Sequence, residues 1–203
     1  MDEYQLRLVK MEDASTLASI YRPYVEKTPI TFEYEAPDAK EFQRRIGKTL
    51  GMFPYLVCES SQDGVIGYAY GSNLYDRAAY RWDTELSIYL SQSHRGKGIG
   101  SALYRGLLGL LKLQGYCKAY ACITYPNDES VKFHQNFGFK QCGYFQQSGF
   151  KLGQWHDVIW MDKPLISTGY HSAPGVLKYV DSLDQEVVAA ILVQAIKGND
   201  LGY

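Results

Sequence analysis

The sequence lacks a surplus of charge of either sign, because 21 lysines and arginines stand against 22 aspartates and glutamates in 203 residues. This balance gives no basic footprint for nucleic acid or anionic lipid. No apolar run reaches the roughly 18 residues that a membrane-spanning helix needs. The N-terminal stretch Met1-Asp2-Glu3-Tyr4 also lacks the basic and apolar regions of a secretory signal. We therefore expect a cytoplasmic protein that has neither nucleic acid nor membrane as a partner.

Cysteine is scarce, and the four that occur, Cys58, Cys117, Cys122 and Cys142, form no CxxC pair and have no histidine at metal-ligand spacing. Each lies among apolar or aromatic residues. This setting favours buried structural thiols in a reducing compartment over a disulfide or a metal site. We expect no metal.

The rest of the composition is that of a globular protein, with 46% hydrophobic and 21% charged residues. It excludes disordered, collagen-like and coiled-coil chains, and the length fits one domain with an appendage. Tyrosine is abundant, with 18 residues. Tyrosines line apolar pockets that also carry hydroxyl groups, although we expect most of them to serve in packing.

Hydrophobic periodicity predicts alternating strands and helices. Strands are expected at 4–9, 55–59, 65–71, 82–90, 119–124, 139–145 and 158–161, and helices at 14–27, 38–50, 99–114 and 129–137. Pro23 is expected to kink or break the first helix. The segment Ser148–Asp157 is expected to separate the last two strands.

The C-terminal part differs in character, since a loop-like stretch at Ser167–Pro174 precedes one more helical pattern. Ser182-Leu183-Asp184-Gln185 has the form of a capping box, and Gly198 suits a C-cap. We divide the chain into a domain of residues 1–166 and a linker with a helical extension at 167–203. Docking of this helix on its own domain is favoured, and a homodimer is the alternative.

A glycine-rich turn separates the long strand at 82–90 from the next helix. Gly96, Gly98 and Gly100 have no Cβ, so a ligand can approach the backbone closely. The free N–H groups and the dipole at the helix N-terminus favour an anion such as phosphate. Arg95 and Lys97 add positive charge. The spacing fits neither GxxxxGK[ST] nor GxGxxG, which disfavours a P-loop and a Rossmann site.

Two motifs together resemble one family. Arg95-Gly96-Lys97-Gly98-Ile99-Gly100 matches the [QR]-x-x-G-x-[GA] signature of the GCN5-related N-acetyltransferase (GNAT) superfamily. Asn127, Ser130 and Phe133-His134-Gln135-Asn136-Phe137-Gly138-Phe139 resemble its second signature.

Three further segments are similar to one group within that family. Thr28–Glu33, Ala79–Trp82 and Gly153–Val158 resemble the phosphinothricin and methionine sulfone or sulfoximine acetyltransferases. The resemblance covers roughly Tyr4–Leu165. It implies an α/β fold of the α+β kind. We expect a mixed, mostly antiparallel sheet of six to seven strands, with splayed central strands and helices on both faces.

The resemblance also implies that acetyl-CoA is the co-substrate. Its pantetheine arm would pair with the backbone of the first splayed strand, and its pyrophosphate would bind the N–H groups of the turn. The implied cofactor-binding residues are Ile88, Tyr89, Leu90, Arg95, Gly96, Lys97, Gly98, Ile99, Gly100, Ser101, Asn127, Ser130 and His134.

Two catalytic residues are implied. An ammonium must lose a proton before it can attack the thioester, and Glu85 stands at the position of the general base in the phosphinothricin enzymes. By itself it also fits a salt-bridged carboxylate on a strand. The N–H of Leu90 is a candidate for stabilising the developing oxyanion. His134 stands where many GNAT enzymes have a tyrosine. Proton donation to the thiolate, cofactor contact and plain packing remain open for it.

For the acceptor pocket the resemblance points to Phe32, Arg77, Tyr80, Glu85 and His156. A guanidinium such as that of Arg77 binds a carboxylate or phosphinate through two hydrogen bonds. A surface arginine, and a histidine satisfied by the adjacent Asp157, are the plainer interpretations. Tyr75-Asp76 replaces the more basic character of the phosphinothricin enzymes, so a less charged analogue is an equal alternative.

Three functions are weighed. The favoured one is acetylation of the α-amine of phosphinothricin, methionine sulfone or methionine sulfoximine, a resistance activity. Direct attack on the thioester is expected, because no cysteine has a histidine partner. The second is the same chemistry on a polyamine, an aminoglycoside or a protein N-terminus. The third is a non-catalytic module that binds CoA.

Overall fold

The computed structural model describes residues 3–166 and 173–198 and contains one sheet of seven strands. The strands are β1 (Tyr4–Leu8), β2 (Tyr55–Ser60), β3 (Gly64–Asn73), β4 (Asp83–Leu90), β5 (Lys118–Tyr125), β6 (Lys140–Lys151) and β7 (Gln154–Pro164). Their order in the sheet is β1-β2-β3-β4-β5-β7-β6. All neighbours are antiparallel except β4 and β5. This arrangement confirms the expected mixed, mostly antiparallel sheet.

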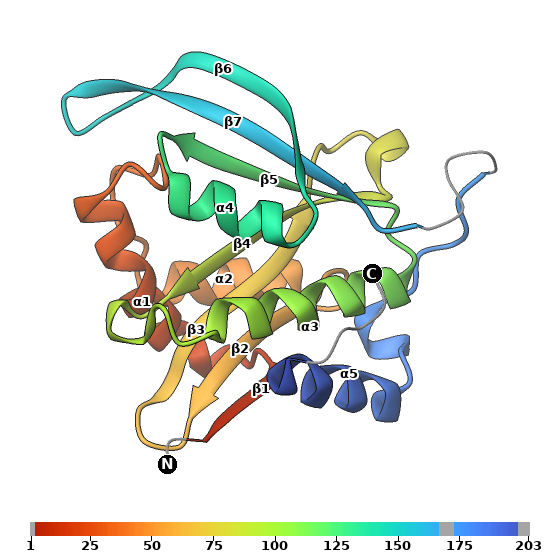
Figure 1. The fold of residues 1–203 in the computed structure, drawn as a ribbon. Coiled ribbons are helices and arrows are strands. Elements are labelled where there is room, and N and C mark those ends of the chain that lie inside the picture. Colours follow the sequence, from red (N-terminus) through yellow and green to blue (C-terminus); the bar gives the residue numbers. More distant parts are fainter. Residues whose placement is uncertain (1–2, 167–172, 199–203) are drawn as a thin grey trace.

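The parallel pair β4 and β5 separates along its length (Figure 1). The two strands are in register only from Asp83–Lys118 to Glu85–Tyr120. Beyond that point β4 pairs with β3 alone and β5 with β7 alone. The sheet therefore opens at its centre, and the opening carries the site described below.

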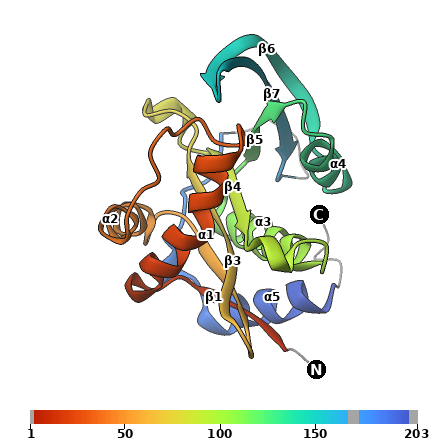
Figure 2. The same cartoon turned by 90° about the vertical axis from the view of Figure 1, so that its left-hand side faces the viewer.

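Helices cover both faces of the sheet, as expected (Figure 2). They are α1 (Ala14–Lys27), α2 (Ala39–Thr49), α3 (Ile99–Gln114), α4 (Asp128–Asn136) and α5 (Gln185–Lys197). Short 3-10 turns occur at Met11–Asp13, Ala78–Tyr80, Gln92–His94 and Val180–Ser182. Helix α1 continues through Pro23 without a break. The side chain of Asp38 caps α2 by accepting from the N–H of Glu41 at 2.8 Å.

Two apolar cores lie on opposite faces of the sheet. One is built from α3, α5 and the sheet, and Leu103, Leu107 and Leu111 of α3 are fully buried in it. The other lies under α1 and α2 and is rich in aromatic rings, among them Tyr21 and Tyr68. The tyrosines of this core therefore serve in packing, against the strands on this face of the sheet.

The β6–β7 hairpin is longer than the sequence pattern indicated. The expectation that Ser148–Asp157 separates two short strands is wrong, because both strands continue to a two-residue turn at Leu152 and Gly153. These two residues have φ values of 52° and 80°, as a type I′ turn requires. The pattern failed because β6 contains two register shifts and is mostly exposed, so apolar alternation is lost.

Helix α5 packs against α3 and β1, with Val188, Leu192 and Ala195 buried. Its cap is Asp184, not Ser182, since the Asp184 carboxylate accepts from the N–H of Glu186 at 2.9 Å. Gly198 ends the helix with φ 75°, as expected of a C-cap. The loop expected at Ser167–Pro174 lies largely outside the described residues.

The four cysteines, all of which lie in the described part of the chain, are not joined by disulfides. Cys58 and Cys117 are buried, but Cys122 and Cys142 are exposed, so the expectation of four buried thiols is wrong for these two. Cys122 lies where β5 leaves β4, and Cys142 lies on the outermost strand β6. Within residues 3–166 and 173–198, no three His, Cys, Asp or Glu side chains are grouped to hold a metal. None of the helices described is long and apolar enough to cross a membrane.

Candidate active site

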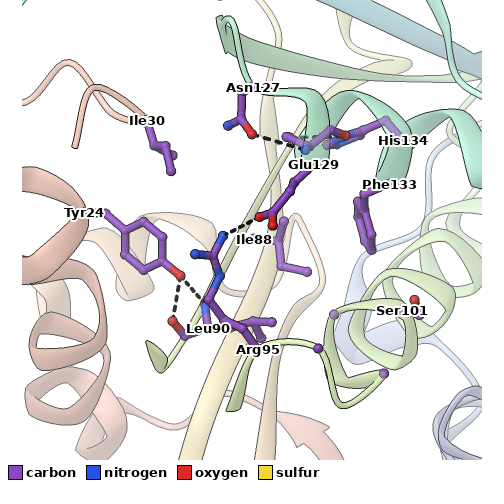
Figure 3. Close-up of a pocket in the computed structure, with 14 residues that line it drawn as sticks. Tyr24, Ile30, Ile88, Leu90, Arg95, Ser101, Asn127, Glu129, Phe133 and His134 are labelled. Carbon is purple, nitrogen blue, oxygen red and sulfur yellow. Dashed lines mark hydrogen bonds and ion pairs between the residues drawn. The ribbon is translucent and has the colours of Figure 1, made fainter. Parts of the chain in front are cut away.

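Two cavities meet in the opening between β4 and β5. The first, of about 410 Å³, lies beside the glycine-rich turn, and Figure 3 shows its lining. The second, of about 230 Å³, lies between the separated strands. They share five lining residues, which are Ile30, Ile88, Asn127, Ser130 and His134. A long ligand in the first cavity therefore reaches the second, where a smaller molecule fits.

The turn before α3 has the geometry of an anion site. Gly96 and Gly98 have φ values of 77° and 79°, which residues with a Cβ rarely adopt. No side chain caps the N-terminus of α3. Gly100 and Ser101 of its first turn line the first cavity. Backbone N–H groups and the helix dipole are thus available to a phosphate group of a ligand in this cavity.

An ion pair crosses the first cavity. Arg95 Nη2 lies 3.3 Å from Glu129 Oε2, and both residues line the cavity (Figure 3). Both side chains are exposed, so the pair is weak and an anionic ligand can replace Glu129. Lys97 is exposed and Ile99 is buried in the core, and neither lines the first or the second cavity.

The end of β4 is held by α1. The Tyr24 hydroxyl donates to the Leu90 carbonyl at 2.7 Å and lies 3.3 Å from the Leu90 nitrogen, which donates to it (Figure 3). The backbone groups of alternate residues in a strand point to the same edge. Ile88 therefore presents its N–H and carbonyl toward the opening, where β5 no longer pairs with β4. The N–H of Ile88 is more available to a ligand than that of Leu90, which donates to Tyr24.

His134 is buried and has a defined tautomer. Its Nδ1 lies 2.7 Å from the carbonyl oxygen of Ser130, which can only accept, so Nδ1 carries the proton. Its Nε2 lies 2.8 Å from the Tyr104 hydroxyl, which donates to it. Burial lowers the pKa of His134 and favours the neutral ring. This geometry argues against proton donation and leaves a cofactor contact and plain packing as the two roles for His134.

The loop before α4 places a second polar group between the cavities. Asn127 caps α4, because its side-chain oxygen accepts from the N–H of Ser130 at 3.2 Å. Its amide nitrogen remains for a ligand. Asn127 and Ser130 line both cavities.

Glu85 lines the second cavity and is the last residue of β4 that pairs with β5. Its carboxylate has no hydrogen-bond donor or ion-pair partner among the described residues. Burial raises its pKa above the ordinary value for glutamate. A half-buried, unpaired carboxylate with a raised pKa is suited to accept a proton from a bound amine.

The structure brings only part of the expected acceptor pocket together. Phe32 lines the second cavity with Glu85, whereas Arg77, Tyr80 and His156 line neither cavity. Arg77 and Tyr80 are exposed in the segment that connects β3 to β4. His156 is buried and donates from Nε2 to the carbonyl of Lys151 at 3.0 Å. Its ring centroid lies 6.3 Å from that of Phe32.

Other lining residues were not predicted as site residues from the sequence. Tyr24 lies in α1 and Thr31 in the loop after it, whereas Cys122 lies in β5 and Glu129 in α4. Only the chain fold brings them to the cavities. Glu85 is the only charged side chain in the described lining of the second cavity, His134 being neutral.

The chain is similar to known acetyltransferases. Residues 6–160 match the model of an acetyltransferase (GNAT) domain. A phosphinothricin N-acetyltransferase of Streptomyces coelicolor is 33% identical over 166 residues, which are 80% of this chain and 97% of that protein. An L-methionine sulfoximine/L-methionine sulfone acetyltransferase of Pseudomonas aeruginosa is 33% identical over 122 residues, covering 60% of this chain and 70% of that protein.

A solved structure supports the same relationship. It is a GNAT superfamily phosphinothricin acetyltransferase of Sinorhizobium meliloti in complex with acetyl-CoA. It is 35% identical, with a TM-score of 0.82, and the alignment covers 89% of this chain and 97% of that one.

Proposed function

The chain belongs to the GNAT family of acetyl-CoA-dependent N-acetyltransferases, and we propose that its acceptor is the α-amine of a small amino-acid analogue. The observation that carries the proposal is the position of Glu85. This carboxylate lies where β4 and β5 separate, in a cavity of about 230 Å³ that adjoins the anion site. The names of the relatives favour phosphinothricin, methionine sulfone or methionine sulfoximine as the acceptor.

Acetyl-CoA supplies an acetyl group activated as a thioester. In our proposal its pyrophosphate binds the N–H groups from Gly96 to Ser101, with Arg95 beside them. Its pantetheine arm follows the open edge of β4 and reaches Asn127. The shared lining of the two cavities by Ile88 and Asn127 supports this path, because it connects the anion site with Glu85.

Glu85 then serves as the general base, directly or through a water molecule. The ammonium form of the acceptor has no lone pair, so a proton must leave before attack on the thioester. The N–H of Ile88 is our choice for stabilising the oxyanion, because the N–H of Leu90 already donates to Tyr24.

Direct transfer, without an acyl-enzyme, is the favoured route. Cys122 as a whole is exposed, but it lines the second cavity, the proposed acceptor cavity. There, partial removal of water from its thiol and the charge of Glu85 raise the pKa of the thiol to about 12. Very little thiolate exists at neutral pH, so this thiol is a poor nucleophile.

The charges in the cavity favour one kind of analogue. The side chain of phosphinothricin is anionic, whereas those of methionine sulfone and sulfoximine are neutral. The second cavity offers no cation among its described lining residues. We therefore rank the neutral side chains above phosphinothricin. A polycationic acceptor is disfavoured, because one carboxylate does not make an acidic cluster.

The test is thiol release from acetyl-CoA with methionine sulfone, phosphinothricin, spermidine and an aminoglycoside in parallel. We expect turnover with methionine sulfone, weaker turnover with phosphinothricin, and none with the polycations. Turnover with the polycations alone would overturn the acceptor class. Glu85→Gln serves as the control, and it should bind acetyl-CoA normally while losing turnover.

A further inference from the structure

The wall of the acceptor cavity is made by two segments far apart in sequence. One is the loop between α1 and α2, which contributes Ile30, Thr31 and Phe32 to the lining of the second cavity. The other is the tip of the β6–β7 hairpin, which packs on the outer side of this loop. Gly149 and His156 are paired across the hairpin, and the Phe32 ring lies against this pair.

Gly149 lies so close to Phe32 that a Cβ at this position would overlap the ring. A Cβ at Gly149 would lie 2.2 Å from Cε2 and 2.4 Å from Cζ of the Phe32 ring. Real Cβ contacts do not come this close, so a methyl group would force the ring away from β6. The ring lines the acceptor cavity, so this displacement alters the volume of the cavity.

The loop is tied to the hairpin on both sides of Phe32. Lys151, which is only 3% exposed, donates from Nζ to the carbonyl of Thr31 at 2.6 Å. The hydroxyl of Tyr34 donates to the carbonyl of Phe150. From the other side, the Thr124 hydroxyl donates to the carbonyl of Pro29 at 2.8 Å. These bonds fix the loop backbone, so a clash at the ring is not relieved by movement of the loop.

We propose that Gly149 and Lys151 determine acceptor specificity by holding the Phe32 ring in the wall of the acceptor cavity. This inference rests on the proposed function, which places the acceptor in the second cavity. Gly149 provides the space for the ring, and Lys151 fixes the backbone that carries it. Both act through Phe32 and are positioning residues. Neither lines the first cavity, where acetyl-CoA is proposed to bind, so we expect changing them to affect the acceptor more than acetyl-CoA.

The test compares Gly149→Ala with the unmodified enzyme, with methionine sulfone and acetyl-CoA varied in turn. We expect the KM for the acceptor to rise about tenfold, the discrimination that a single methylene gives in an apolar pocket. The KM for acetyl-CoA should change by less than about twofold. Gly143→Ala is the matched control, because it lies on the same strand and a Cβ there meets nothing closer than 3.4 Å.

A second variant separates specificity from misfolding. Phe32→Leu replaces the ring that the new methyl group of Gly149→Ala would contact with a smaller side chain. The double variant Phe32→Leu/Gly149→Ala should therefore regain much of the acceptor affinity lost in Gly149→Ala. Lys151→Met should raise the acceptor KM as well, and Lys151→Arg should raise it less. Equal rises in both KM values, or no rescue by Phe32→Leu, would overturn the proposal.

This inference and the proposed function can fail independently of each other. If the enzyme acetylates a different amine, the acceptor class fails, and the same variants are measured with that amine. A double-mutant cycle on the melting temperature tests the Gly149–Phe32 contact without turnover. Additive effects there would overturn the inference, even if the enzyme acetylates methionine sulfone.

Discussion

Glu85 and Tyr120 are the last pair of residues that β4 and β5 share before the two strands separate. The proposed base therefore stands at the vertex of the opening, on a backbone that β3 and β5 hold from both sides. A side chain on a paired strand is more precisely fixed than one on a loop. The same vertex leaves its carboxylate half-buried, which raises its pKa.

Replacement of Glu85 by Gln should lower kcat by about 10²- to 10⁴-fold, the usual contribution of a general base. The amide keeps the shape of the side chain but cannot accept the proton. Steady-state turnover and acetyl-CoA binding by calorimetry check this, and only turnover should change. A kcat within about threefold of the unmodified enzyme would exclude Glu85 as the base.

The rate of the unmodified enzyme should fall on acidification as Glu85 becomes protonated. Since burial raises its pKa, the fall should begin at a higher pH than for an exposed glutamate. The profile of kcat/KM against pH measures this. If Glu85 is the base, the acidic limb disappears in Glu85→Gln. Retention of an identical limb would assign it to another group.

The raised pKa of Glu85 also predicts an effect on stability. A carboxyl whose pKa is higher in the folded than in the unfolded chain favours folding while protonated, and this contribution is lost as pH rises through the folded pKa. Glu85→Gln should therefore melt at a higher temperature than the unmodified protein near pH 7. The difference should vanish below about pH 4, under the unfolded value. A lower melting temperature at pH 7 would contradict the burial of this charge.

Replacement of Tyr104 by Phe should reduce stability and leave catalysis nearly intact. It removes the donor to His134 Nε2 and leaves a buried acceptor unsatisfied, at a cost of about 1–3 kcal/mol. Denaturant unfolding measures this cost. Because the neutral, hydrogen-bonded ring of His134 is not expected to donate a proton, kcat should fall less than about threefold. A loss of 100-fold or more would contradict this and assign the Tyr104–His134 pair a part in catalysis.

Replacement of Glu129 by Gln should strengthen acetyl-CoA binding. It removes a carboxylate that competes with the ligand's phosphates for Arg95. We expect the KM for acetyl-CoA to fall by about two- to fivefold at low salt, in line with an exposed ion pair. The gain should fade at high ionic strength. Glu186→Gln, an exposed acid on α5, is the control, and an equal change there would assign the effect to net charge.

Several features were predictable from the sequence because they depend on residues close together in the chain. The glycines at 96 and 98, the Asp38 cap and the alternation of β4 are set by local backbone sterics and hydrogen bonding, within a few residues of one another. The two motifs then sufficed to identify the family and, with it, acetyl-CoA as the co-substrate. Glu85 followed from its position on β4 relative to those motifs.

Only the tertiary structure decided which side chains face the opening. Tyr24 meets Leu90 across 66 positions of sequence, and Phe32 meets Gly149 across more than one hundred. Arg77, which was expected to bind the acid group of the acceptor, is exposed in the segment between β3 and β4 and lines neither cavity. Such contacts arise from the packing of whole elements, which the free energy of the complete fold determines and no local pattern records. The sequence by itself determined the glycine-rich turn before α3 and the strand that carries the proposed base, whereas packing alone decided the shape and charge of the proposed acceptor cavity.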